Sequence, residues 1–94
     1  MKVDVSGKCL IEVSGEACAA CLAVLPNCAA VAEKFGLKFV KISVEEHPET
    51  VETYRLERLP SIILAEDGKE IAKCSGYQPA EILELWVEAK LGVQ

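Results

Sequence analysis

Lys and Arg residues are too few and too scattered in this sequence to favour binding to nucleic acid. Ten basic residues stand against fifteen acidic ones, which gives a formal net charge of −5 at pH 7. Because phosphates are neutralised by basic residues gathered on one surface, this composition argues against a nucleic-acid partner. The acidic balance would instead suit a protein partner with a basic docking surface.

Long apolar runs are also missing. No stretch approaches the length that crosses a bilayer, so we expect no membrane partner. The first residues, MKVDVSGKCL, lack the apolar stretch and the cleavage site of a secretory signal. The expected location is therefore cytoplasmic.

Metal ligands are scarce. A closed zinc site needs four ligands, but no second CxxC and no CxxH accompanies the pair Cys18 and Cys21. The single histidine, His47, precedes Pro48 and is interpreted as a polar residue at a helix start. We therefore expect no metal, and the sequence offers no base for cysteine-hydrolase chemistry.

Cysteine is the residue type that the sequence does contain in an informative pattern. Five cysteines, at positions 9, 18, 21, 28 and 74, are a poor fit to a secreted disulfide framework because their number is odd. A bond between Cys18 and Cys21 would close so short a loop that it would add only about 2 kcal/mol of stability. Such a bond suggests chemistry, and we expect Cys9, Cys28 and Cys74 to pack as small apolar side chains, with Cys74 close to the CxxC turn as an open alternative.

The order of apolar and turn residues predicts one α/β domain over residues 1–94. Predicted strands are residues 9–14, 37–44, 61–65 and 70–75, predicted helices are 18–35, 47–56 and 79–92, and residues 2–5 are a candidate for one more short strand. Asp67-Gly68 predicts a hairpin, and two strand-helix-strand crossovers predict a parallel core. The expected fold is a central mixed sheet of about four strands with helices on both faces, in the order β-α-β-α-β-β-α.

Two charged residues interrupt strands that are otherwise apolar. Glu12 shares a strand face with Leu10, and Lys41 shares one with Phe39. Charges are costly inside a sheet unless they are paired. Either the pleat directs one of them to solvent, or the strands are neighbours and the charges meet, which would leave a partly buried carboxylate beneath the cysteine-bearing turn.

The spacing of Cys18 and Cys21 predicts redox chemistry. Cys18 occupies the expected N-cap of a helix, where free backbone N–H groups and the helix dipole favour a thiolate. Lowering a thiol pKa from ~8.5 to ~7 takes about 2 kcal/mol, which these two effects together can supply. Cys21 lies one turn further on, within reach of a disulfide after a modest tightening. Cys18 would attack a target disulfide, Cys21 would resolve the product, and a buried Glu12 could accept the proton of Cys21. The remaining alternative is an inert helix start with buried thiols.

These features together resemble the thioredoxin family over nearly the full length of the chain. Glu12 lies six residues before Cys18, where that family has a buried acid, and Lys41 matches the lysine that pairs with the acid. The remaining matches are CAAC with the family's CGPC, Pro26 with a helix-kinking proline, Leu59-Pro60-Ser61 with Ile-Pro-Thr, and Gly76 with a glycine that lets a partner approach. In the family the peptide bond before this second proline is cis, a rare feature.

The resemblance implies a thioredoxin-like fold and a thiol-disulfide oxidoreductase that reduces protein disulfides. The implied catalytic residues are Cys18, Cys21, Glu12 and Lys41, the last two as a proton relay, and the implied substrate-binding residues are Leu59, Pro60, Ser61 and Gly76. The resemblance also implies a monomer, a thioredoxin-reductase-like electron donor, and no cofactor beyond the redox-active Cys18–Cys21 disulfide.

The sequence also departs from the family. Ala17 stands where the family has a tryptophan, and Ala19-Ala20 replaces Gly-Pro. The N-terminal strand and helix of the family are mostly missing. Two alternatives therefore stay open, a non-enzymatic interaction module and a glutathione-dependent reductase of glutaredoxin type, although the CPYC motif and the Gly-Gly pair typical of glutaredoxins are absent from the sequence.

Overall fold

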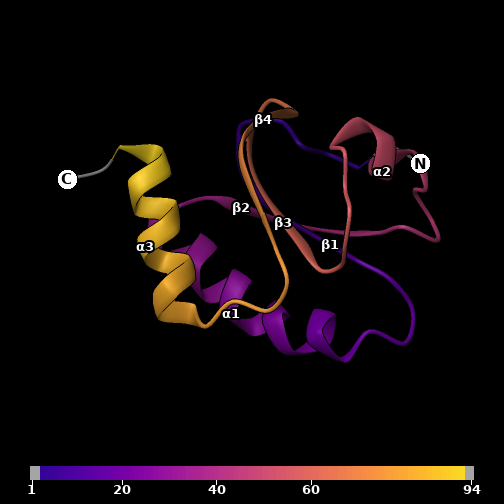
Figure 1. The fold of residues 1–94 in the computed structure, drawn as a ribbon. Helices are drawn as coiled ribbons and strands as arrows, with labels where there is room; N and C mark the ends of the chain where they lie inside the picture. The colour runs from indigo at the N-terminus through magenta and orange to yellow at the C-terminus, as the bar shows by residue number, and fades with distance from the viewer. Residues whose placement is uncertain (1–2, 93–94) are drawn as a thin grey trace.

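A four-stranded mixed sheet forms the centre of the molecule (Figure 1). The structure is a computed structural model and describes residues 3–92. Along the chain the elements are β1 (Lys8–Ser14), α1 (Ala19–Phe35), β2 (Lys38–Ser43), α2 (Glu49–Thr53), β3 (Ser61–Glu66), β4 (Lys69–Ser75) and α3 (Ala80–Leu91). In space the strands follow the order β2-β1-β3-β4, which places β1 and β3 in the middle. The predicted order of elements is confirmed.

The direction of one strand differs from the prediction. β1 and β2 are parallel as expected, but β1 and β3 run antiparallel, as do β3 and β4. The predicted second parallel crossover is therefore wrong. Its helix, α2, has only five residues and spans about 8 Å at ~1.5 Å per residue. It is too short to carry the chain back along the sheet, so β3 starts at the end where β2 finishes.

Helices cover both faces of the sheet, as predicted. Figure 1 shows α1 and α3 on one side of the sheet and α2 on the other. The first face buries a core of ten residues: Leu10, Val24, Cys28, Val31, Ala32, Leu37, Ile62, Leu64, Leu83 and Val87. The second face buries a smaller core around Ile11, Val13 and Ile63, closed by Tyr54 at the end of α2. Successive residues of β1 alternate between the two cores, which is the pattern of a strand buried on both faces.

The ends of the long helices follow from their terminal residues. Gly36 ends α1 in a left-handed conformation (φ 66°), and the amide of Leu37 then donates to the carbonyl of Ala32 at 2.8 Å. Gly92 ends α3 in the same way (φ 71°). Neither helix is long and apolar enough to cross a membrane, and the same holds for α2 within the described residues.

Two predicted boundaries are wrong. The helix predicted over 47–56 is formed only by Glu49–Thr53, because the chain turns through a left-handed residue at Arg55 (φ 54°). The additional strand considered over residues 2–5 is not present at Val3–Val5, and residue 2 lies outside the described residues.

Candidate functional site

Four strand ends meet at one end of the sheet. β1, β2 and β4 finish there and β3 begins there, because Ser61 pairs with Val13 on one side and with Ser75 on the other. In the parallel pair of β1 and β2, the last residues of the two strands, Ser14 and Ser43, lie opposite each other. The turn that leads from β1 into α1 therefore delivers Cys18 to the end of the sheet at which Pro60 enters β3.

Cys18 caps the N-terminus of α1, as the sequence predicts. Its backbone is extended (φ −116°, ψ 96°), and its Sγ accepts a hydrogen bond from the amide of Cys21 at 3.2 Å. Its carbonyl accepts from the amide of Leu22, also at 3.2 Å. The sulfur thus faces the unpaired N–H groups of the first turn, where the helix dipole favours negative charge.

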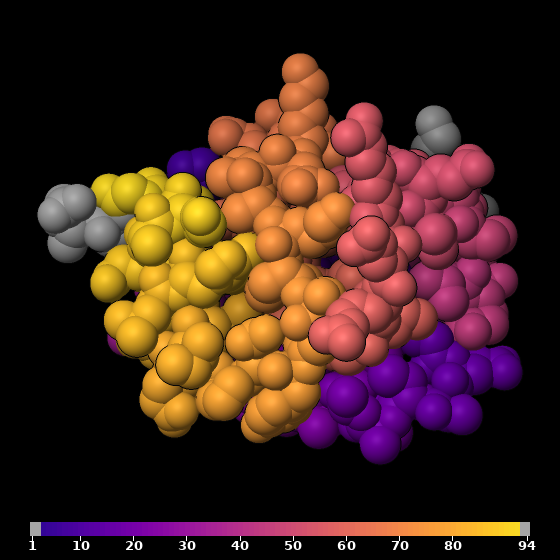
Figure 2. Space-filling model, viewed as in Figure 1, coloured from indigo at the N-terminus to yellow at the C-terminus, as the bar shows by residue number. Residues whose placement is uncertain are grey.

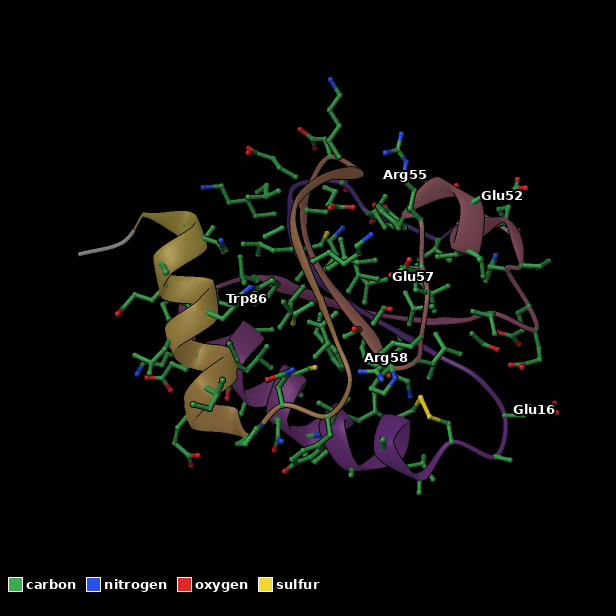
Figure 3. The ribbon with its side chains drawn as sticks, in the orientation of Figure 1. Glu16, Glu52, Arg55, Glu57, Arg58 and Trp86 are labelled. Atoms are coloured by element: carbon green, nitrogen blue, oxygen red, sulfur yellow. A yellow bond between two sulfur atoms is a disulfide. The ribbon has the colours of Figure 1, made fainter. Side chains whose placement is uncertain are left out.

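Cys18 and Cys21 form a disulfide with a Cα–Cα distance of 5.2 Å, drawn as the yellow bond in Figure 3. The two sulfurs differ in their access to solvent. Cys21 is only 2% exposed, whereas Cys18 is half-buried and lies at the surface of the turn. Cys18 is therefore the sulfur of the pair that is more accessible from outside.

Glu12 lies fully buried in the central strand β1. Neither of its carboxylate oxygens has a hydrogen-bond partner among the described residues. Burial raises the pKa of Glu12 from 4.5 to about 7, and the Ser14 side chain and the positive charge of Lys41 offset this only in part. A carboxyl group with this pKa can gain or lose a proton near neutral pH.

Lys41 lies directly opposite Glu12 in the register of β1 and β2. The two strands are therefore neighbours, as one of the two interpretations required. The lysine side chain is exposed, however, and no ion pair joins it to Glu12 within residues 3–92. The expectation that the two charges meet is wrong in this respect: β2 is an edge strand, so the long lysine side chain reaches water and keeps its hydration.

The segment before β3 lies against the turn that carries the cysteines. The Leu59–Pro60 peptide bond is cis, as the resemblance implies. A Cβ at Gly15 would come within 2.9 Å of Leu59 Cδ1, so the Leu59 side chain packs closely against this glycine and would have to shift if a larger residue stood there. The amide of Gly76 donates to the carbonyl of Pro60 at 2.8 Å. The positions expected to bind substrate, Leu59, Pro60, Ser61 and Gly76, thus lie together beside the CxxC turn.

Three further residues lie at this site and were not anticipated from the sequence. Asn27 Nδ2 donates to the carbonyl of Gln78 at 2.9 Å and to Tyr77 Oη at 3.2 Å, which ties the loop after β4 to α1. Arg58 Nη1 lies 3.9 Å from the position that a Cβ at Gly76 would take. The three residues are Asn27, Tyr77 and Arg58. They are the sequence neighbours of the motif residues Pro26, Gly76 and Leu59, and this adjacency was the only signal in the sequence.

The three remaining cysteines are not part of a disulfide. Burial raises the pKa of Cys28 to about 12 and that of Cys74 to about 11, so both are protonated at physiological pH. Cys9 and Cys28 are fully buried in the two cores. Cys74 lies two strands away from Glu12 in the register, since both pair with Ile62. Residues 3–92 contain no cluster of three His, Cys, Asp or Glu side chains suited to a metal.

Comparison with known proteins places this arrangement in one family. The chain is similar to an H-type thioredoxin of Fagopyrum esculentum, with 29% identity over 84 residues that span 87% of this chain and 72% of the relative. It is also similar to the thioredoxin of Listeria monocytogenes, with 33% identity over 69 residues, 71% of this chain and 67% of that protein.

A solved structure supports the same fold. A mutant thioredoxin from Halobacterium salinarum superposes with a TM-score of 0.79 and 22% sequence identity, covering 90% of this chain and 75% of the other. The thioredoxin family model matches residues 2–89, which is nearly the whole chain. With a Cys18–Cys21 disulfide at the start of α1, the chain belongs to the thioredoxin family and is a thiol-disulfide oxidoreductase.

Proposed function

We propose that the protein reduces disulfide bonds in other proteins and is itself reduced again by a thioredoxin-reductase-like donor. The observation that supports this most directly is the pairing of an accessible N-cap sulfur, Cys18, with a buried sulfur, Cys21, one turn away. We place the protein in the cytoplasm, because three unpaired cysteines beside a redox pair suit a reducing compartment.

In the first step the Cys18 thiolate attacks one sulfur of a substrate disulfide. A bond forms between Cys18 and that sulfur, the substrate S–S bond breaks, and the second substrate sulfur leaves as a thiolate. The amide of Cys21, which donates to Cys18 Sγ, would stabilise the attacking thiolate. The solvent access of Cys18 allows the substrate sulfur to come into line.

In the second step Cys21 attacks Cys18 and releases the substrate. The mixed disulfide breaks, the Cys18–Cys21 disulfide forms, and the substrate leaves with both of its sulfurs reduced. Because Cys21 is buried, its thiol needs a base to take up its proton. We assign this role to Glu12, whose pKa of about 7 suits proton transfer at neutral pH. Lys41, beside Glu12 on the edge strand, would favour its ionised form and link it to solvent.

The substrate segment would bind beside the cis peptide bond. Leu59 lies against Gly15, and Gly76 carries no side chain that would cover the site. The backbone of Leu59 can then pair with an extended substrate segment, while Pro60 and Ser61 hold the turn, Ser61 through a 2.6 Å hydrogen bond from Oγ to the carbonyl of Arg58. The attacked disulfide would lie over Cys18.

Reduction of insulin by dithiothreitol tests this function. We expect the wild-type protein to accelerate precipitation of the insulin chains several-fold, and the Cys18→Ser/Cys21→Ser double variant to leave the uncatalysed rate unchanged. Circular dichroism of the double variant provides the folding control. If the two proteins gave the same rate, the proposed reductase activity would be wrong.

Alkylation of the reduced protein tests the role of the helix N-terminus. We expect the rate of Cys18 labelling by iodoacetamide to be half-maximal near pH ~7, against ~8.5 for a free thiol. Mass spectrometry after proteolysis measures the labelled residue, and Cys74 serves as the internal control, because its raised pKa should keep its labelling slow. A Cys18 profile with its midpoint at or above pH ~8.5 would contradict the stabilisation of the thiolate.

A further inference from the structure

Arg58 brings a positive charge to the rim of the active site. The residue is exposed, precedes Leu59 at the cis peptide bond, and places its Nη1 beside Gly76. In Figure 3 its side chain projects at the same lower edge of the sheet as the disulfide. In Figure 2 the salmon atoms of the segment before β3 border the purple atoms at the start of α1 on this face.

No ion pair neutralises this charge within the part of the chain that the structure describes. The ion pairs among residues 3–92 join Lys34 to Glu84, Lys38 to Asp4, and His47 to Glu49, and none of them involves Arg58. Its backbone is nevertheless fixed, because its carbonyl accepts the Ser61 hydroxyl. The guanidinium therefore extends from a fixed backbone position at the rim, with its donors available to a ligand.

The opposite side of the site is acidic. Glu16, in the turn before Cys18, points away to the right of the disulfide in Figure 3, on the side opposite Arg58. The backbone amide of Glu16 donates a hydrogen bond to Oε2 of Glu45 at 3.2 Å. A substrate that crosses the site thus meets the cation of Arg58 on one side and, on the other, the carboxylate of Glu45, whose Oε2 lies 3.4 Å from the position of a Cβ at Gly15.

We propose that Arg58 binds a carboxylate of the substrate, so that the protein prefers disulfides with an Asp or Glu beside the attacked cysteine. A guanidinium binds a carboxylate through two parallel hydrogen bonds, which gives a defined geometry as well as charge attraction. The polarity of the rim limits the preference to one side of the cysteine, because an acidic residue on the other side would approach the carboxylate of Glu45 beside Gly15. This inference rests on the proposed reductase function and names its substrate class.

A set of synthetic peptides tests the proposal. Each peptide is closed by one internal disulfide and carries Glu, Gln or Lys either directly before or directly after its first cysteine. Reduced protein is mixed with each peptide, the reaction is quenched with acid, and the opened peptide is separated and quantified. The protein dithiol is oxidised to the Cys18–Cys21 disulfide as the peptide disulfide is reduced to two thiols, so one peptide is opened per protein.

For one of the two positions we expect the Glu peptide to react about two- to fivefold faster than its Gln counterpart at low salt, and the Lys peptide to react most slowly. In Arg58→Gln this ratio of rates falls to about one, and in Arg58→Glu the order of the Glu and Lys peptides reverses. Arg55→Gln is the matched control: it removes the same charge from the same loop, but Figure 3 shows Arg55 at the far end of this segment, and the ratio should stay as in the wild type.

The outcomes distinguish a failure of the role of Arg58 from a failure of the proposed reductase function. If the wild-type protein opened none of the peptides, the proposed reductase function would fail. If it opened all of them, but the Glu to Gln ratio was one at both positions or persisted in Arg58→Gln, only the role of Arg58 would be overturned.

Discussion

Cys21→Ser should accumulate a covalent complex with a disulfide substrate, whereas Cys18→Ser should accumulate none. The reason is the difference in access between the two sulfurs: Cys18 is half-buried at the surface, while Cys21 is 2% exposed. Attack by Cys18 alone forms the mixed disulfide, and without a thiol at position 21 nothing resolves it. We expect nearly all of the Cys21→Ser protein to be trapped when an oxidised substrate protein is in excess.

Non-reducing electrophoresis and mass spectrometry measure this complex. The complex should disappear on addition of dithiothreitol, which shows that it is a disulfide. Cys74→Ser is the matched control, because this thiol lies on the same face of the sheet as Glu12 but is protonated. When Cys74→Ser is added to Cys21→Ser, the amount of trapped complex should not change. Equal trapping by Cys18→Ser and Cys21→Ser would show that the assigned order of attack is wrong.

The placement of the two cysteines could be predicted because it depends on short-range structure. A cap residue and the residue three positions later lie on the same side of a helix start whatever the rest of the fold does. The hydrogen bond from the Cys21 amide to Cys18 Sγ is the direct result of that local geometry. The same applies to Gly36 and Gly92, which end their helices in left-handed conformations.

The direction of β3 and the exposure of the Lys41 side chain could not be predicted from local patterns. An alternating strand shows which residues share a face but not which neighbour it pairs with, so nothing in residues 61–65 indicated an antiparallel partner in β1. The register opposite Glu12 was anticipated, but the edge position of β2 determines that Lys41 reaches solvent. Arg58 could not be predicted for a related reason. Nothing in the sequence distinguishes it from any other surface arginine, and only the fold brings it close to Gly76.

The difference in stability between Glu12→Gln and the wild type should shift in favour of the variant by about 3 kcal/mol between pH 4 and pH 8. The folded protein raises the pKa of Glu12 to about 7, whereas the unfolded chain restores a value near 4.5. Below about pH 4.5 Glu12 is protonated in both the folded and the unfolded protein, so its effect on the free energy of unfolding does not change with pH. Between the two pKa values only the folded state holds the proton, so the contribution of Glu12 to wild-type stability falls by about 1.4 kcal/mol per pH unit and stops falling above about pH 7.

Urea unfolding of the oxidised proteins at steps between pH 4 and pH 9 measures this effect. The Gln amide is also buried, so a constant offset between the two proteins is expected; only the change of their difference with pH reports on the charge of Glu12. Glu66→Gln, an exposed carboxylate at the end of β3, should follow the wild-type curve throughout. A difference between the wild type and Glu12→Gln that stayed constant from pH 4 to pH 9 would mean that Glu12 does not titrate near neutrality, and Glu12 would then lack the proton affinity that its proposed role toward Cys21 requires.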